Sequence, residues 1–144
     1  MRIAALGFAV LGLASFAASA ADAPPAELGQ RIYSTICQGC HMSEGQGAKG
    51  AGEYPKLAGN PRMASWQFVA LTVLMGRHGM PAFGGVGDVE PAVAKMAGQL
   101  TDEQIAAVVN YVRTHFGNDF KDKATTRDVG RLPHPGGNGI GRAG

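Results

Sequence analysis

The pentapeptide Cys37-Gln38-Gly39-Cys40-His41 constrains this chain more than any other feature. It contains the only two cysteines of the 144 residues, three positions apart, with a histidine directly after the second. A close cysteine pair serves a redox disulfide, contributes ligands to a zinc site, or attaches a haem through two thioethers. Which of these three kinds of site is present has to be decided from the rest of the sequence.

The N-terminal residues predict export. Residues 3–17 form an apolar run behind Arg2, and Ala18-Ser19-Ala20 has the small-x-small pattern of a signal-peptidase site. The run is shorter than the roughly 20 apolar residues of a membrane-spanning helix. We therefore expect residues 1–20 to be a cleaved signal peptide and the protein to be periplasmic, with an uncleaved N-terminal tether as the alternative.

The surroundings of the pentapeptide favour haem. A thioredoxin-like redox pair would lie in a βαβ context, which the sequence lacks, and a structural zinc site would need a second pair of ligands. In c-type haem attachment two thiols bond to the porphyrin and the following histidine ligates the iron. The sequence thus predicts Cys37 and Cys40 as attachment points and His41 as an axial ligand. A thiol–disulfide oxidoreductase remains the alternative.

Helical periodicity predicts an all-α fold. Residues 24–36 carry an apolar stripe, and residues 65–75 are apolar enough for a buried helix with Ser65 as its N-cap. Residues 101–116 begin with the capping box Thr101-Asp102-Glu103-Gln104. Residues 90–98 predict a further short helix, and the glycine-rich residues 42–63 predict a long irregular loop. So few helices bury little apolar surface alone, which favours a cofactor in the interior.

Residues 24–117 resemble the class I cytochrome c family. The resemblance rests on Gly29 and Tyr33 before the pentapeptide, the Pro55-Lys56-Leu57 loop, Gly79-Met80-Pro81, and the final capped helix with Tyr111. It implies the class I cytochrome c fold, with three to five short helices around one covalently attached haem c. It also implies that Gly29 and Tyr33 pack against Val108 and Tyr111.

Several side chains compete for the sixth position of the iron. Met80 precedes Pro81, which stiffens the backbone, and the resemblance also selects it. His78 is the rival, because imidazole is a good iron ligand. Met42 adjoins His41 and cannot reach the opposite face of the haem, whereas Met75 lies on an apolar run and is expected in the core. Met63 and Met96 complete the candidates.

Three further residues are expected around the haem. The resemblance implies that the Pro55 carbonyl accepts the second ring N–H of His41. Trp66 and Arg77 offer donors suited to the haem propionates, although Trp66 could equally be a core aromatic. His115 and His134 are expected at the surface.

The C-terminal residues depart from the family pattern. Residues 118–144 contain a Pro- and Gly-rich end, so we expect a cytochrome domain over 21–117 followed by an extended or flexible tail. The chain has 13 Lys and Arg against 11 Asp and Glu, and it shows no basic stripe with interleaved aromatics. Nucleic acid is therefore not an expected partner.

These patterns together predict a periplasmic monohaem c-type cytochrome that transfers single electrons. It would transform no substrate itself and would serve as the electron-accepting partner or subunit of a dehydrogenase, passing electrons to a downstream acceptor. An iron with an open sixth position would instead make the chain a ligand sensor or an enzyme.

Overall fold

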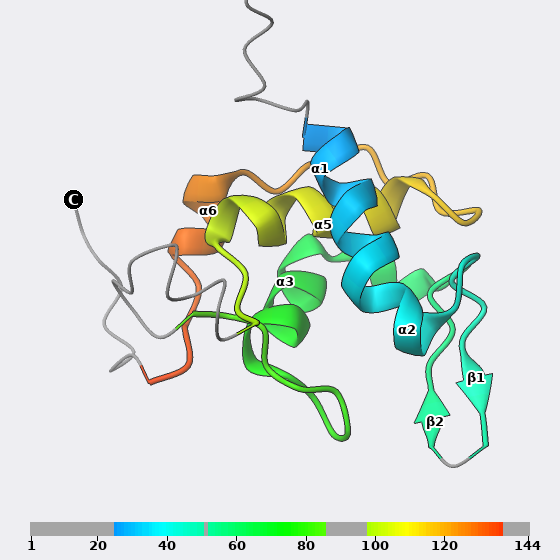
Figure 1. The fold of residues 1–144 in the computed structure, drawn as a ribbon. Coiled ribbons are helices and arrows are strands. Elements are labelled where there is room, and N and C mark those ends of the chain that lie inside the picture. Colours follow the sequence, from blue (N-terminus) through cyan, green and yellow to red (C-terminus); the bar gives the residue numbers. More distant parts are fainter. Residues whose placement is uncertain (1–24, 51, 86–97, 137–144) are drawn as a thin grey trace, which may run out of the picture.

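The computed structural model describes residues 25–50, 52–85 and 98–136, and it shows a mainly helical domain (Figure 1). The expected signal peptide, Met96 and all but the last residue of the expected helix at 90–98 lie outside these ranges. No helix within the described ranges has the length and apolar character needed to cross a membrane. In chain order the elements are α1 (Pro25–Ile32), a π-helical turn η1 (Tyr33–Cys37), α2 (Gln38–His41), β1 (Ala48–Lys49), β2 (Glu53–Tyr54), a 3₁₀ turn η2 (Pro61–Ala64), α3 (Trp66–Met75), α5 (Asp102–Thr114) and α6 (Thr126–Gly130).

The first helix continues further than its apolar stripe predicted. Between α1 and α2 the chain makes a π-helical turn, in which the Gln38 N–H donates to the Tyr33 carbonyl five residues earlier. The Ser34 and Thr35 hydroxyls donate to the Arg31 carbonyl at 3.0 and 2.7 Å, and such contacts loosen the regular α-helical ladder. The helical chain therefore runs through this turn and both cysteines as far as His41.

The capped ends of the two long helices are confirmed. The Phe68 N–H donates to the Ser65 hydroxyl at 3.2 Å at the start of α3. At the start of α5, the Gln104 N–H donates to the Thr101 hydroxyl, and the Thr101 N–H donates to the Gln104 side chain. These bonds satisfy backbone donors that have no partner inside the helix.

A small hairpin interrupts the loop that follows α2. Strands β1 and β2 pair antiparallel, with Ala48 opposite Tyr54 and Lys49 opposite Glu53. The sequence predicted no strand here, because two residues on each side are too few for an alternating pattern. The hairpin leads directly to Pro55, one of the expected site residues.

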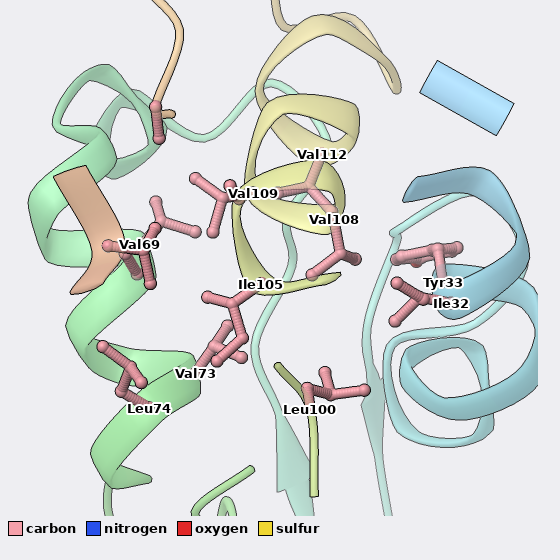
Figure 2. Packing of buried hydrophobic residues seen from close by; sticks show 14 of the residues in the cluster. Ile32, Tyr33, Val69, Val73, Leu74, Leu100, Ile105, Val108, Val109 and Val112 are labelled. Carbon is pink, nitrogen blue, oxygen red and sulfur yellow. The ribbon is translucent and has the colours of Figure 1, made fainter. Parts of the chain in front are cut away.

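The core lies where α5 packs against α1 and α3 (Figure 2). Ile105, Val109 and Leu74 are fully buried at its centre. Figure 2 shows side chains of α1, α3 and α5 pointing toward one another in this space. The three helices thus form a continuous apolar cluster, where the sequence predicted only a thin one.

The crossing of α1 and α5 depends on Gly29. A Cβ atom at this position would lie 2.3 Å from the Ala107 carbonyl oxygen and 2.8 Å from the Tyr111 Cβ. The Tyr33 ring packs one helical turn further along, 5.7 Å from the Tyr111 ring. Gly29 therefore packs against Tyr111, as the resemblance implied, but its other nearest neighbour in α5 is Ala107 and not the expected Val108.

Residues 118–136 are folded against the domain, whereas the sequence predicted an extended or flexible tail. Helix α6 packs on α5, and Val129 is fully buried between them. The α6 N-terminus has its own capping box, in which Thr125 and Asp128 exchange hydrogen bonds. Asn110 of α5 also pairs with both backbone groups of Ala124 at 2.8 and 2.9 Å. The chain beyond Gly117 is thus part of the domain as far as residue 136.

Arg113 ties this C-terminal segment to the core. Its side chain has no exposed surface and donates to the carbonyls of Met63, Ala64 and Asp122 and to the Asp122 carboxylate. The bond to the carboxylate, at 2.6 Å, holds the pKa of Asp122 below its ordinary value. His134, expected at the surface, is partly buried and lies 2.7 Å from the Asp102 carboxylate.

Substituting Gly29 by alanine will destabilise the fold. Alanine has the better helix propensity by about 1 kcal/mol, but its methyl group would overlap the backbone of α5. We expect a net loss of about 1–3 kcal/mol in the free energy of unfolding, measured by chemical denaturation. Gly39→Ala is the control, because a Cβ there meets no heavy atom within 4 Å. An equal effect of both substitutions would contradict the close crossing.

Acid will weaken the attachment of the C-terminal segment through Asp122. Because its pKa is lowered in the folded protein, the pair with Arg113 stabilises the fold at neutral pH. That contribution is lost as the pH falls below about 4 and through the lowered pKa. The melting temperature of Asp122→Asn should therefore change less with pH in this range than that of the wild type. Asp119→Asn, which removes an exposed ion pair with Lys121, should behave as the wild type.

Candidate haem site

The three chemical groups of the pentapeptide lie on one helical stretch. Cys37 ends the π-helical turn, and Cys40 and His41 follow in α2. Positions three and four apart share one side of a helix, so the two thiols and the imidazole face a common space. Cys37 is half-buried, Cys40 is exposed and His41 is 7% exposed.

His41 is oriented by the backbone of the loop after the hairpin. Its Nδ1 lies 2.9 Å from the Pro55 carbonyl oxygen. A carbonyl can only accept, so Nδ1 carries the proton and Nε2 is left as the nitrogen for a metal. The acceptor is the carbonyl that the resemblance implied, and contacts of this kind orient histidines that ligate metals.

Gly47 lets the Pro55 segment approach His41. Its φ is +69°, and a Cβ atom would lie 2.3 Å from the Tyr54 carbonyl oxygen and 2.8 Å from the Lys56 nitrogen. The Gly47 N–H also donates to the His41 carbonyl at 3.1 Å. Sequence reasoning missed this residue, because it treated the glycines of 42–63 together as signs of an irregular loop.

The backbone directly after His41 is strained. Met42 has φ +65° and ψ 164°, a region that is almost reserved for glycine. The Tyr33 hydroxyl donates to the Met42 carbonyl at 2.7 Å, which helps to hold this conformation. Burial raises the pKa of Tyr33 to about 12, so the hydroxyl keeps its proton over the physiological range.

Met80 closes a tight turn after α3. The Arg77 N–H donates to the Met80 carbonyl at 3.0 Å, and the Met80 N–H donates to the Arg77 carbonyl at 2.9 Å. Met80 is half-buried against the core cluster, whereas His78 is exposed with φ +53°. The same turn therefore packs the thioether against the core and leaves the rival imidazole in solvent.

Gly76 allows this turn to fold back on the end of α3. Its φ is +70°, and a Cβ atom would lie 2.6 Å from the Met80 carbonyl oxygen and 2.8 Å from the Ala82 nitrogen. Beyond the turn, the Phe83 and Gly84 N–H groups donate to the Val73 and Leu74 carbonyls at 2.9 and 3.0 Å. The turn is thus fixed on both sides, and Gly76 is a second site residue that sequence reasoning missed.

The other methionines have different surroundings. Met63 is 5% exposed and belongs to the core. Met75 was expected in the core, but this prediction is wrong, because its side chain is 47% exposed. Met42 directly follows His41, as the sequence shows, and Met96 lies outside the described residues. Met80 is half-buried and lies in a turn that two hydrogen bonds hold, so among the described methionines it best fits a fixed iron ligand.

Trp66 and Arg77 come from the two ends of α3. Trp66 is the first residue of the helix and packs, half-buried, against the core cluster. The exposed Arg77 guanidinium lies over the Phe68 ring, 5.4 Å from its centroid, and lines a hollow of about 450 Å³ with Arg62 and Ser65. Arg77 therefore lies over Phe68 in the first turn of α3, the turn that begins with Trp66.

These residues fit a c-type haem better than the other two chemistries. Burial raises the pKa of the Cys37 thiol to about 11, which does not suit a reactive redox thiolate. Within the described residues, which include both cysteines, no three His, Cys, Asp or Glu side chains gather as a metal site. Two thiols within one helical turn, an imidazole with Nε2 left for iron, and a half-buried thioether match the donor set of a c-type cytochrome.

Comparison with known proteins agrees with this assignment. The cytochrome c family model matches residues 26–116, and the chain belongs to the cytochrome c family. Members of this family are electron carriers that bind haem c covalently, and the cofactor of this chain is haem c. The helical architecture is that of the class I cytochromes.

Its relatives include cytochromes c-552 and cytochrome subunits of dehydrogenases. The chain is 38% identical to the fructose dehydrogenase cytochrome subunit of Gluconobacter japonicus over 62% of its own length, but it spans only 19% of that protein. It is 35% identical to cytochrome c-552 of Thermus thermophilus, over 72% of this chain and 82% of that one. With the cytochrome c subunit of the quinone alcohol dehydrogenase of Gluconobacter oxydans it shares 30% identity, over 72% of this chain and 21% of that one.

Substituting Gly76 by alanine will destabilise the Met80 turn. The positive φ of this position is unfavourable for alanine and costs about 1–3 kcal/mol. The added methyl group would also overlap the backbone of the turn. We expect a loss of at least this size in the free energy of unfolding of the haem-bearing protein. Gly79→Ala is the matched control, because a Cβ at that position of the same turn meets no heavy atom within 4 Å. Equal stability of the two variants would contradict the role of Gly76.

Proposed function

We propose that this chain is a periplasmic monohaem cytochrome c that transfers single electrons, with His41 and Met80 as the two axial ligands. Cys37 and Cys40 attach the haem through thioethers. The observation that carries the proposal is the contact between His41 Nδ1 and the Pro55 carbonyl at 2.9 Å, directly behind the two thiols. It fixes the imidazole and leaves Nε2 as the nitrogen for the iron.

Ligation from both sides suits a carrier. When bound, the haem supplies a one-electron Fe(III)/Fe(II) couple, and a thioether opposite an imidazole raises its reduction potential. His41 is held by Pro55, and Met80 is held by its bonds to Arg77, so each ligand is positioned before any electron arrives. Fixed ligands keep the reorganisation on reduction small and leave no open site for a substrate.

Trp66 and Arg77 are proposed to bind the haem propionates. Their indole N–H and guanidinium donors suit a carboxylate, and both residues adjoin the first turn of α3. Arg77 is also only three residues from Met80. Residues 77–80 would thus contribute both a donor to a haem propionate and the second axial ligand of the iron.

We further propose a dehydrogenase as the electron donor and a second redox protein as the acceptor. Support comes from relatives whose names describe cytochrome subunits of fructose, alcohol and gluconate dehydrogenases. Export to the periplasm is supported by the charged, apolar and small-residue pattern of residues 1–20. The chain itself would transform no substrate.

The visible spectrum of the periplasmically expressed protein tests this function. We expect a Met-to-Fe(III) charge-transfer band in the oxidised form and a reduced form that is indifferent to CO. Met80→Ala should lose the band and bind CO, whereas His78→Ala and Met75→Ala should leave both properties unchanged.

Two results would overturn the proposal. If the wild type binds CO readily, the sixth position is open, and the chain is a ligand-binding or catalytic haem protein. If the band survives Met80→Ala but disappears in His78→Ala or Met75→Ala, another residue is the ligand. A colourless protein with two titratable thiols would favour the oxidoreductase alternative.

A further inference from the structure

The segment after α5 contacts the chain at both ends of α3. We propose that residues 118–136, here called the brace, position the Met80 turn by holding α3 and the segment behind that turn. This inference rests on the proposed ligation by Met80. It assigns a role in the haem site to a part of the chain that lies beyond the family match at residues 26–116.

The first anchor is the buried guanidinium of Arg113. It donates to the Asp122 carboxylate of the brace at 2.6 Å, and to the Met63 and Ala64 carbonyls at 2.7 and 3.0 Å. These two carbonyls immediately precede Ser65, the N-cap of α3. Because the planar guanidinium has a fixed donor geometry, Asp122 and the start of α3 are held in a defined relation.

The second anchor lies near the other end of α3. Pro135 packs against Gly84, where a Cβ atom would lie 3.1 Å from the Pro135 Cδ and 2.9 Å from the Leu74 carbonyl oxygen. The Gly84 N–H donates to that Leu74 carbonyl at 3.0 Å. Pro135 therefore covers the point at which the chain leaving the Met80 turn is bonded to the end of α3.

His134 secures this second anchor. Its Nε2 lies 2.7 Å from the Asp102 carboxylate at the start of α5, and its Nδ1 lies 2.7 Å from the Leu132 carbonyl. These two contacts fix Pro135, the next residue, relative to α5. The imidazole therefore connects α5, the brace and the segment behind the Met80 turn.

Between the anchors the brace is itself fixed on α5. Val129 is fully buried, Ala124 is 4% exposed, and Asn110 bonds to the backbone of Ala124 on both sides. Figure 1 shows α6 lying beside α5. Movement of α3 or of the segment at Gly84 must therefore break contacts with a rigid neighbour, which lowers the population of states with Met80 displaced.

Full-length, haem-bearing variants that release one anchor each test the brace. Asp122→Asn weakens the first anchor by removing the charge of the carboxylate that Arg113 pairs with, and His134→Ala removes the side-chain contacts of the second. Pro135→Ala is a milder variant that keeps both sets of hydrogen bonds. Asp119→Asn and Lys121→Gln are matched controls, because each removes only the exposed ion pair between these two side chains of the brace. Three quantities are measured: the thermal loss of the Met-to-Fe(III) band, the thermal loss of helical circular dichroism, and the rate of CO association with the reduced protein.

We expect each anchor variant to lose the band at a lower temperature than its helices, and the controls to behave as the wild type. Loss of one hydrogen bond to a charged group should raise the displaced population, and with it the CO association rate, about tenfold. Parallel loss of band and helices with an unchanged CO rate would overturn the inference, because the segment would then only stabilise the fold. Unchanged behaviour of all three variants would also overturn it. A wild type without the band would instead refute Met80 ligation, which is a separate failure.

Discussion

The close crossing of α1 over α5 is the constraint on which the haem site depends. Gly29 brings the two helices near enough for its Cα to face the Ala107 carbonyl, and Tyr33 then packs on Tyr111. The helix that makes this crossing continues through the π-helical turn and ends at His41. Its angle against α5 therefore sets where the two thiols and the imidazole stand, and any residue larger than glycine would move all three together.

The two residues proposed as axial ligands, His41 and Met80, come from distant parts of the chain, and glycines position the backbone near both. Gly47 lets the Pro55 carbonyl approach His41, and Gly76 lets the Met80 backbone fold back on α3. In each case the glycine has a positive φ and no side chain, so another segment of backbone can lie directly against it. Met42, directly after His41, has a similar conformation without being glycine, and strain of this kind concentrates at functional sites.

Local signals in the sequence predicted where α3 and α5 begin. The hydroxyl caps of Ser65 and Thr101 act within three residues of themselves, so their bonds could be inferred without knowledge of the fold. The π-helical turn could not be inferred, because a single inserted residue changes the helical period without a distinctive composition. The spacing predicted Cys37, Cys40 and His41 as the donor set, but the roles of Gly47 and Gly76 depend on neighbours that only the folded chain supplies.

The C-terminal segment shows where composition misleads. Its prolines and glycines suggested a flexible tail, yet the Thr125–Asp128 capping box before Val129 was a local helix signal that went unused. What composition could not show is Arg113, whose guanidinium joins Asp122 to the carbonyls of Met63 and Ala64. A buried cation needs its partners, because leaving it unpaired costs more than the pair gains. The arginine thus makes a segment of low apolar content an obligatory part of the domain and couples it to the helix that ends beside Met80.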